Sequence, residues 1–217
     1  MPIQKITSGV IDGTTTFANT AISGTITASQ IATVNANTIT SGSIPLAQIP
    51  QLTGVKLPTG SVLQVIQAVK TDTFSSSSAT FGDVTGLTVS ITPTSSSNKI
   101  LISGVMQTSS LSNDMWKMRI AKNGTAIFVG DTVAGATSAL SQFYYYSASN
   151  VGNYSTFPVS VYYLDSPATT SSVTYSWQIR TQSDGNTVWV NRNSDQSGNS
   201  TQNFYGASSI IVMEIAA

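Results

Sequence analysis

The amino-acid sequence predicts an all-β protein: a carboxy-terminal, jelly-roll-like β-sandwich preceded by an extended, repeat-containing segment. Three observations lead to this prediction. From about residue 61 onward, short runs of alternating apolar and polar residues follow one another, turn-forming residues separate these runs, and no helical period interrupts them. The front of the chain instead contains a degenerate repeat rich in Thr, Ser, Asn and Gly, which disfavours a helix.

The two parts meet at a joint rich in proline and glycine. Three prolines and two glycines fall between residues 45 and 60, and such residues interrupt regular hydrogen bonding. We place the domain boundary near Pro58, so that residues 1–57 form the extended segment and residues 58–217 form the sandwich. A chain of about 155 residues is long enough to build one self-sufficient hydrophobic core.

The extended segment repeats an Ile-(Thr)-Ser-Gly-x-Ile pattern at residues 6–11, 22–26 and 39–44. Between Asp12 and Lys56 no residue carries a charge. Alone, such a segment buries too little apolar surface to offset its conformational entropy, so we expect it to become ordered against copies of itself or a larger assembly. The alternative is a low-complexity leader without fixed structure. The side chains predicted to point inward in an assembly are Ile6, Ile11, Ile22, Ile26, Ile39, Ile44 and Ile49.

The first predicted strands follow the joint. Residues 62–70 form a mostly apolar run, which is typical of a buried strand. Residues 87–92 alternate apolar and polar side chains up to a proline, and residues 100–104 continue on one face of the next strand. In residues 116–120 the large apolar side chains alternate with two basic ones, so we expect one side to face the core and the other to face solvent.

The remaining strands are separated by turn signals. Asn123-Gly124 is a strong signal for a tight hairpin, and Asp184-Gly185-Asn186 indicates another turn. Further strands are predicted at residues 127–129, 159–163, 173–179, 188–190 and 208–215. The total is about nine or ten short strands, as expected for a sandwich.

Composition excludes several classes of function. Charged residues make up 8% of the chain, against a usual share of about a quarter, and they balance to a net charge of zero. A neutral chain exerts little long-range attraction on nucleic acid or anionic lipid, so we expect neither partner. No apolar run is long enough to cross a membrane, and the first residues lack the apolar core of a signal peptide, so we expect neither membrane insertion nor secretion by the usual route.

We expect no enzymatic activity, no cofactor and no metal site. His and Cys are absent, which removes the commonest general base, the thiol nucleophile and most zinc chemistry. Glycoside hydrolysis would need two carboxylates across a cleft, whereas the acidic residues are scattered singly and most lie at predicted turns, such as those of Asp165 and Asp184. Residues 191–198 alternate like a calcium loop but hold a single carboxylate and lack its closing Glu, so a solvated loop is the preferred interpretation.

The strongest binding candidate is the aromatic run at residues 143–146, together with the loop that follows it. Aromatic rings stack on the apolar faces of sugars, while amide groups bond to hydroxyls. Because alternate residues of a strand face the core, we expect two of these four aromatic side chains to be structural. The residues predicted to contact a receptor are Tyr144, Tyr146, Asn150, Asn153, Tyr154 and Trp189.

Several segments in sequence order resemble the fibre proteins of tailed bacteriophages. Residues 37–50, Asn-Thr-Ile-Thr-Ser-Gly-Ser-Ile-Pro-Leu-Ala-Gln-Ile-Pro, look like the shaft repeats of these fibres. The segments similar to a fibre head domain are residues 60–65, 81–87, 91–93, 163–167 and 210–215. Together, these segments spread the resemblance over most of the chain.

The resemblance implies a homotrimeric virion protein. Its amino-terminal segment would attach to other virion proteins of the tail or capsid, and its sandwich would be displayed as a knob that recognises a host-surface glycan or protein. The shaft is shorter than in most host-binding fibres, so a trimeric capsid decoration protein that stabilises or decorates the head is the alternative. A cellular β-sandwich binding module is the third interpretation, and it predicts a stable monomer.

Overall fold

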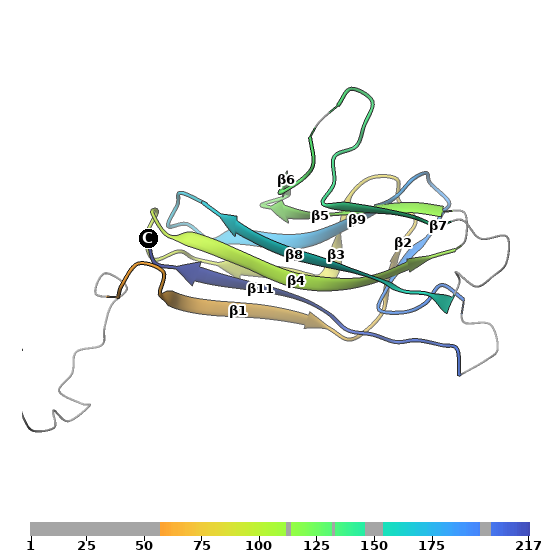
Figure 1. Ribbon diagram of the computed structural model, residues 1–217, viewed down its shortest axis with the longest axis horizontal. Coiled ribbons are helices and arrows are strands. Elements are labelled where there is room, and N and C mark those ends of the chain that lie inside the picture. Colours follow the sequence, from red (N-terminus) through yellow and green to blue (C-terminus); the bar gives the residue numbers. More distant parts are fainter. Residues whose placement is uncertain (1–56, 112–113, 132, 146–153, 196–200) are drawn as a thin grey trace, which may run out of the picture. The chain divides into compact units, whose positions relative to one another are not determined.

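The computed structural model describes residues 57–217, except residues 112–113, 132, 146–153 and 196–200 (Figure 1). The repeats of the predicted shaft and its seven isoleucines therefore lie outside the described residues.

The described residues form eleven strands and no α-helix, which confirms the all-β prediction. The expectation of about nine or ten strands was slightly low, because the sequence gave no clear signal for the three-residue strand β2. The strands are β1 (Val62–Lys70), β2 (Phe74–Ser76), β3 (Gly82–Ile91), β4 (Lys99–Ser110), β5 (Asp114–Lys122), β6 (Thr125–Ile127), β7 (Ser141–Tyr145), β8 (Phe157–Asp165), β9 (Val173–Thr181), β10 (Val188–Val190) and β11 (Ser208–Ile215).

These strands make two antiparallel sheets. Sheet A has the order β1-β11-β4-β10-β2, and β8 pairs with the free side of β4. Sheet B has the order β3-β9-β5-β6, and β7 also pairs with β5. In Figure 1, β1, β11, β4 and β8 run side by side across sheet A. Apart from the β5–β6 hairpin, most neighbouring strands in each sheet are far apart in sequence, so long-range pairing defines the fold.

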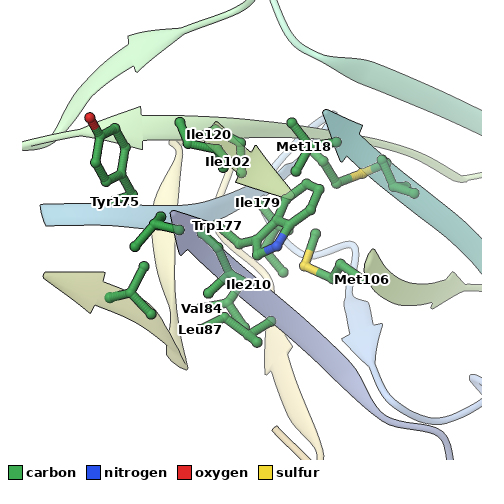
Figure 2. Close-up of a cluster of buried hydrophobic side chains, with 14 of the residues drawn as sticks. Val84, Leu87, Ile102, Met106, Met118, Ile120, Tyr175, Trp177, Ile179 and Ile210 are labelled. Carbon is green, nitrogen blue, oxygen red and sulfur yellow. The ribbon is translucent and has the colours of Figure 1, made fainter. Parts of the chain in front are cut away.

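Both sheets contribute side chains to a single hydrophobic core (Figure 2). Alternation along each strand directs one set of residues inward: Ile102 and Met106 from β4, and Trp177 and Ile179 from β9, are fully buried. Burial of side chains of this size stabilises the fold by about 1.5–3 kcal/mol each. The predicted alternation in β3, β4, β5, β8 and β9 therefore identified the core-facing residues correctly.

Gly104 allows the close approach of the two sheets. A Cβ atom at this position would lie 2.6 Å from the backbone oxygen of Ser209 on the neighbouring strand and 3.2 Å from Nε1 of Trp177. The indole of Trp177 therefore occupies the space that a side chain at Gly104 would need. In turn, Nε1 of Trp177 donates to the same Ser209 oxygen at 3.3 Å.

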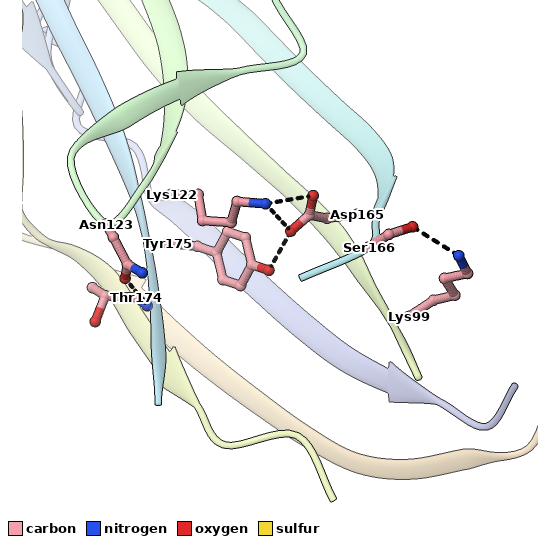
Figure 3. Close-up of polar contacts among 7 residues, drawn as sticks. All are labelled: Lys99, Lys122, Asn123, Asp165, Ser166, Thr174 and Tyr175. Atoms are coloured by element: carbon pink, nitrogen blue, oxygen red, sulfur yellow. Dashed lines mark hydrogen bonds and ion pairs between the residues drawn. The ribbon is translucent and has the colours of Figure 1, made fainter. Parts of the chain in front are cut away.

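The predicted hairpin at Asn123-Gly124 joins β5 to β6. Both residues have positive φ, at 49° and 80°, as a two-residue turn that follows the twist of its strands requires. The Asn123 side chain also connects this turn to β9, the other neighbour of β5 in sheet B. Its Oδ1 accepts a hydrogen bond from the backbone nitrogen of Thr174 at 2.9 Å (Figure 3). The sequence thus predicted the position and the tight form of this hairpin correctly.

Candidate functional site

The receptor residues predicted from sequence lie on different parts of the fold. Tyr144 is on β7 of sheet B and is 57% exposed, whereas Trp189 is on β10 of sheet A and is half-buried. Tyr154 lies between β7 and β8 and is also half-buried. The other three, Tyr146, Asn150 and Asn153, lie outside the described residues.

The aromatic run on β7 divides as strand alternation requires. Phe143 points inward and packs against the core, with its ring centroid 5.7 Å from that of Trp116 and 5.2 Å from that of Phe157. Tyr144 points the opposite way, beside Met115 of β5. Trp189 faces outward on sheet A, where the guanidinium of Arg192 lies 5.5 Å from its ring centroid.

Asp165 is buried at the end of β8 and joins the two sheets (Figure 3). Lys122 of β5 places its Nζ 3.0 Å from both carboxylate oxygens, and the hydroxyl of Tyr175 on β9 donates to Oδ2 at 2.7 Å. Burial, and then the hydrogen bond to Asp165, raise the pKa of Tyr175 well above its usual value, so this phenol stays protonated as a donor. The interpretation of Asp165 as a turn residue was therefore wrong, because it terminates a strand and pairs with a lysine across the sheets.

Glu214 is the single glutamate of the chain, and its side chain is fully buried on β11. Four groups donate to it: the Gln64 side chain at 2.6 Å, the backbone and hydroxyl of Thr94 at 2.6 and 2.8 Å, and the Asn98 side chain at 2.6 Å. Burial alone would raise the pKa of Glu214, but these donors outweigh burial and lower the pKa below its usual value. The carboxylate thus joins β1, β11 and the turn between β3 and β4.

Asp114, at the start of β5, has a similar structural role. It accepts hydrogen bonds from the hydroxyl of Ser110, from the side chain of Asn186 at 2.6 Å and from the backbone nitrogen of Met115 at 2.7 Å. All three buried carboxylates are thus engaged by neighbouring strands or turns. Within the described residues, no group of three or more acidic side chains is placed to hold a metal ion.

The outward face of sheet B carries a cluster of basic residues, which we call the basic face: Lys117 and Arg119 on β5, and Arg180 on β9. Lys117 pairs directly with Arg180 across the two strands, and Arg119 pairs with Gln178. Two cations directly opposite each other on one sheet face destabilise the pairing of their strands. Folding alone therefore gives no reason for this arrangement.

The ring of Phe81 supports the two arginines of the basic face. The guanidinium carbon of Arg119 lies 4.0 Å from the ring centroid and that of Arg180 lies 5.9 Å from it. Arg119 Nε also donates to Gln178 Oε1 at 2.7 Å, and Gln178 Nε2 donates to Asp83 at 2.7 Å. Partial burial lowers the pKa of Arg119, and the charge of Asp83 opposes this shift. Arg119 stays cationic because its ordinary pKa is far above neutrality.

No carboxylate forms an ion pair with the three cations of the basic face among the residues that the structure describes. The two ion pairs there join Lys70 to Asp72 and Lys122 to Asp165. Arg180 donates to neutral groups, the backbone oxygens of Thr181 at 2.9 Å and Gln182 at 3.2 Å. Lys117 has one long contact of 3.5 Å, to the backbone oxygen of Thr137.

The outward face of sheet A has the opposite character, and we call it the apolar face. Its large apolar side chains are Val65, Val69, Leu101, Val105, Tyr162, Leu164, Ile211 and Met213, and the polar side chains of Gln67, Ser103, Ser160 and Ser209 lie among them. Register places Leu164, Leu101, Met213 and Val65 in one row across four strands. Tyr162 is 73% exposed and Val65 is 55% exposed. Lys99, the first residue of β4, is the one charged residue that these four strands direct outward, so the face combines many apolar side chains with almost no charge.

Comparisons with models of protein families and with curated proteins return no match. In the described part of the chain, no helix has the length and apolar character needed to cross a membrane.

Sequence reasoning missed both faces as functional surfaces. It placed Lys117 and Arg119 on the solvent side of their strand, but Arg180 belongs to a strand much further along the chain, and only the β5–β9 register brings it opposite Lys117. A usable signal was present, because Arg180 follows Ile179 in an alternating run and must therefore face outward. The prediction that residues 62–70 form a mostly buried strand was wrong, because β1 lies at the edge of sheet A and its outward side chains Val65 and Val69 are exposed.

Proposed function

We infer that this chain is a non-enzymatic virion structural protein, a short homotrimeric fibre that attaches to the particle through its amino-terminal segment and displays a β-sandwich knob toward the host surface. The observation that carries this proposal is the apolar face of sheet A. Apolar patches of this kind mark interaction surfaces, because soluble monomers rarely expose contiguous apolar area. A trimer, in turn, is what the resemblance to phage fibres implies.

The strand order supports a jelly-roll knob. Four strands of sheet A follow the order β1-β11-β4-β8, and four strands of sheet B follow the order β3-β9-β5-β7. Eight strands in two sheets of four are typical of jelly rolls, which occur in viral capsid proteins and lectins, and here successive strands change sheet except between β5 and β7. Fold alone does not define function, so this order supports the proposal without carrying it.

The near absence of charge on the apolar face favours a partner face of the same kind. A charged partner would have to bury unpaired ions, which costs several kcal/mol for each ion. Copies of the face gathered around a threefold axis meet this requirement, since apart from Lys99 its outward residues are aliphatic, aromatic or neutral. Burying a fully exposed apolar side chain of this size contributes up to about 3 kcal/mol, so several such residues from each copy offset an association cost of about 4–15 kcal/mol.

The engagement of the buried carboxylates supports a non-enzymatic role. Asp114, Asp165 and Glu214 are each saturated by donors from neighbouring strands or turns, so each has a structural explanation. A displayed protein of this kind acts by binding, and several copies would multiply weak contacts by avidity.

Imaging of particles with labelled protein tests the proposal. Full-length protein carrying a small tag should be detected on the tail of phage particles, where a host-binding fibre is attached. Label on the head would instead identify a capsid decoration protein. Particles that carry no label, although the protein is produced with them, would overturn the virion assignment.

A further inference from the structure

We propose that the basic face of sheet B binds an acidic polysaccharide, with Arg119 and Arg180 on the carboxylates and Tyr144 stacked on a sugar ring. The proposal deepens the displayed role inferred above and rests on it for where the ligand is met, but the binding chemistry depends on the described residues alone. Three observations support it: a cluster of cations that outnumbers the carboxylate beside it, a preorganised guanidinium and an adjacent exposed aromatic ring.

The first step is charge. Lys117, Arg119 and Arg180 lie on neighbouring strands without an ion-paired carboxylate in the described part of the chain. Asp83 of β3 lies in the same row as Arg119 and is joined to it through Gln178, so this carboxylate offsets part of the charge and the three cations still outnumber it. In a chain with so few charges, a cluster of three like charges favours a ligand of opposite sign.

The second step is preorganisation. Phe81 lies against the guanidinium of Arg119, and Gln178 accepts from its Nε, so two contacts fix the orientation of the group. The two terminal nitrogens of Arg119 have no hydrogen-bond partner among the described residues. A guanidinium presents its paired donors in a geometry that matches a carboxylate, and an oriented side chain loses less entropy when it binds.

The third step is the neighbouring polar and aromatic surface. Register places Gln142 opposite Lys117 and Tyr144 opposite Met115, so both β7 side chains share the outward face with the cations. Both are exposed. Successive outward rows of a sheet are about 7 Å apart, which lets one ring stack on Tyr144 while a carboxylate nearby meets the cations. The combination of stacking, amide and cationic groups favours an acidic sugar chain over a bare anion.

Titration calorimetry of the full-length protein with four probes tests the proposal. We expect binding of oligogalacturonate, a carboxylated sugar chain, that weakens as salt is raised, because screening acts on exposed charges. Dextran, polyphosphate and duplex DNA should each bind at least about tenfold more weakly. Equal affinity for dextran would overturn the role of charge, and equal or tighter binding of polyphosphate or DNA would overturn the assignment of a sugar ligand.

Variants then locate the site. Arg119→Gln and Arg180→Gln should each weaken oligogalacturonate binding about tenfold, and Tyr144→Ala should weaken it several-fold. Lys99→Gln, which removes a cation from sheet A, is the matched control and should bind as wild type. If either arginine variant fails to fold, Lys117→Gln tests the same face, because Lys117 has only the one long contact. Wild-type affinity in the folded variants would overturn the proposal.

Failure of this proposal and failure of the virion assignment are distinguishable. If the protein labels particles normally but does not bind the sugar, only the proposed ligand is overturned. If it binds the sugar but is absent from particles, only the virion assignment is overturned.

Discussion

At the scale of single residues, buried polar groups and one glycine fix the contacts between strands. Glu214 accepts four hydrogen bonds from side-chain and backbone donors on two segments, β1 and the β3–β4 turn, and none of these donors carries a charge. Gly104 has the reverse role, because the absence of a side chain makes room for Trp177. Each residue therefore has a predictable effect on stability.

Replacing Glu214 by Gln should destabilise the protein by about 1–3 kcal/mol at neutral pH, because an amide cannot accept all four donors. The folded-state pKa of Glu214 lies below its ordinary value of 4.5. The carboxylate therefore stabilises the fold fully above about pH 4.5, and this contribution is lost as pH falls through the lower folded-state pKa. Denaturant titrations of both proteins at several pH values measure the difference. A difference between the proteins that does not shrink below pH 4.5 would contradict this account.

Replacing Gly104 by Ala should destabilise the protein by about 1–3 kcal/mol, because the new methyl group would meet the Ser209 backbone and the Trp177 indole. Gly82→Ala on β3 is the matched control, since a Cβ there has no atom within 4 Å. Thermal unfolding compares the two variants with wild type. Equal midpoints for Gly104→Ala and Gly82→Ala would show that the close approach is not as tight as described.

At the scale of elements, the outward faces of the two sheets carry different kinds of side chain, basic on sheet B and mostly apolar on sheet A, whereas both inward faces are apolar. The inward faces merge into one core, whereas the basic face and the apolar face favour different partners. One row of the apolar face is apolar across four strands, and Ile211 lies in the next row between Gln67 and Ser103, so a charge placed at Ile211 should affect any assembly built on this face.

Replacing Ile211 by Lys should dissociate the assembly without unfolding the chain, because Ile211 faces outward at the centre of the apolar face and a buried lysine would lack a partner. Thr88→Lys, an outward substitution on the exposed side of β3, is the control and should leave the assembly intact. Light scattering coupled to size exclusion gives the mass of each variant. An Ile211→Lys protein with the wild-type mass would exclude this face as the interface.

Strand positions were largely predictable from sequence, whereas strand partners were not. Alternation identified the core-facing residues of β3, β5, β8 and β9, and Asn123-Gly124 was correctly predicted as a tight hairpin turn. Which strands pair depends on contacts between distant segments, and no local pattern encodes them. The basic face is the clearest example, since Lys117 and Arg180 become neighbours only through the β5–β9 register. The role given to Asp165 failed for the same reason, because its partner Lys122 lies on another strand.

At the scale of the whole molecule, we propose that a folded sandwich follows an amino-terminal segment that becomes ordered only against other polypeptides. The first part rests on the described residues, and the second rests on the sequence, in which no charge occurs between Asp12 and Lys56. Both parts lead to the same expectation. A chain with a nearly uncharged sheet face and an uncharged leader should not remain alone in solution.

Sedimentation of the purified full-length protein over a wide range of concentration tests this expectation most directly. We predict a species with three times the mass of one chain that persists on dilution. A particle with the mass of a single chain at every concentration would contradict the account, because it would show that neither the apolar face nor the uncharged segment needs a second copy.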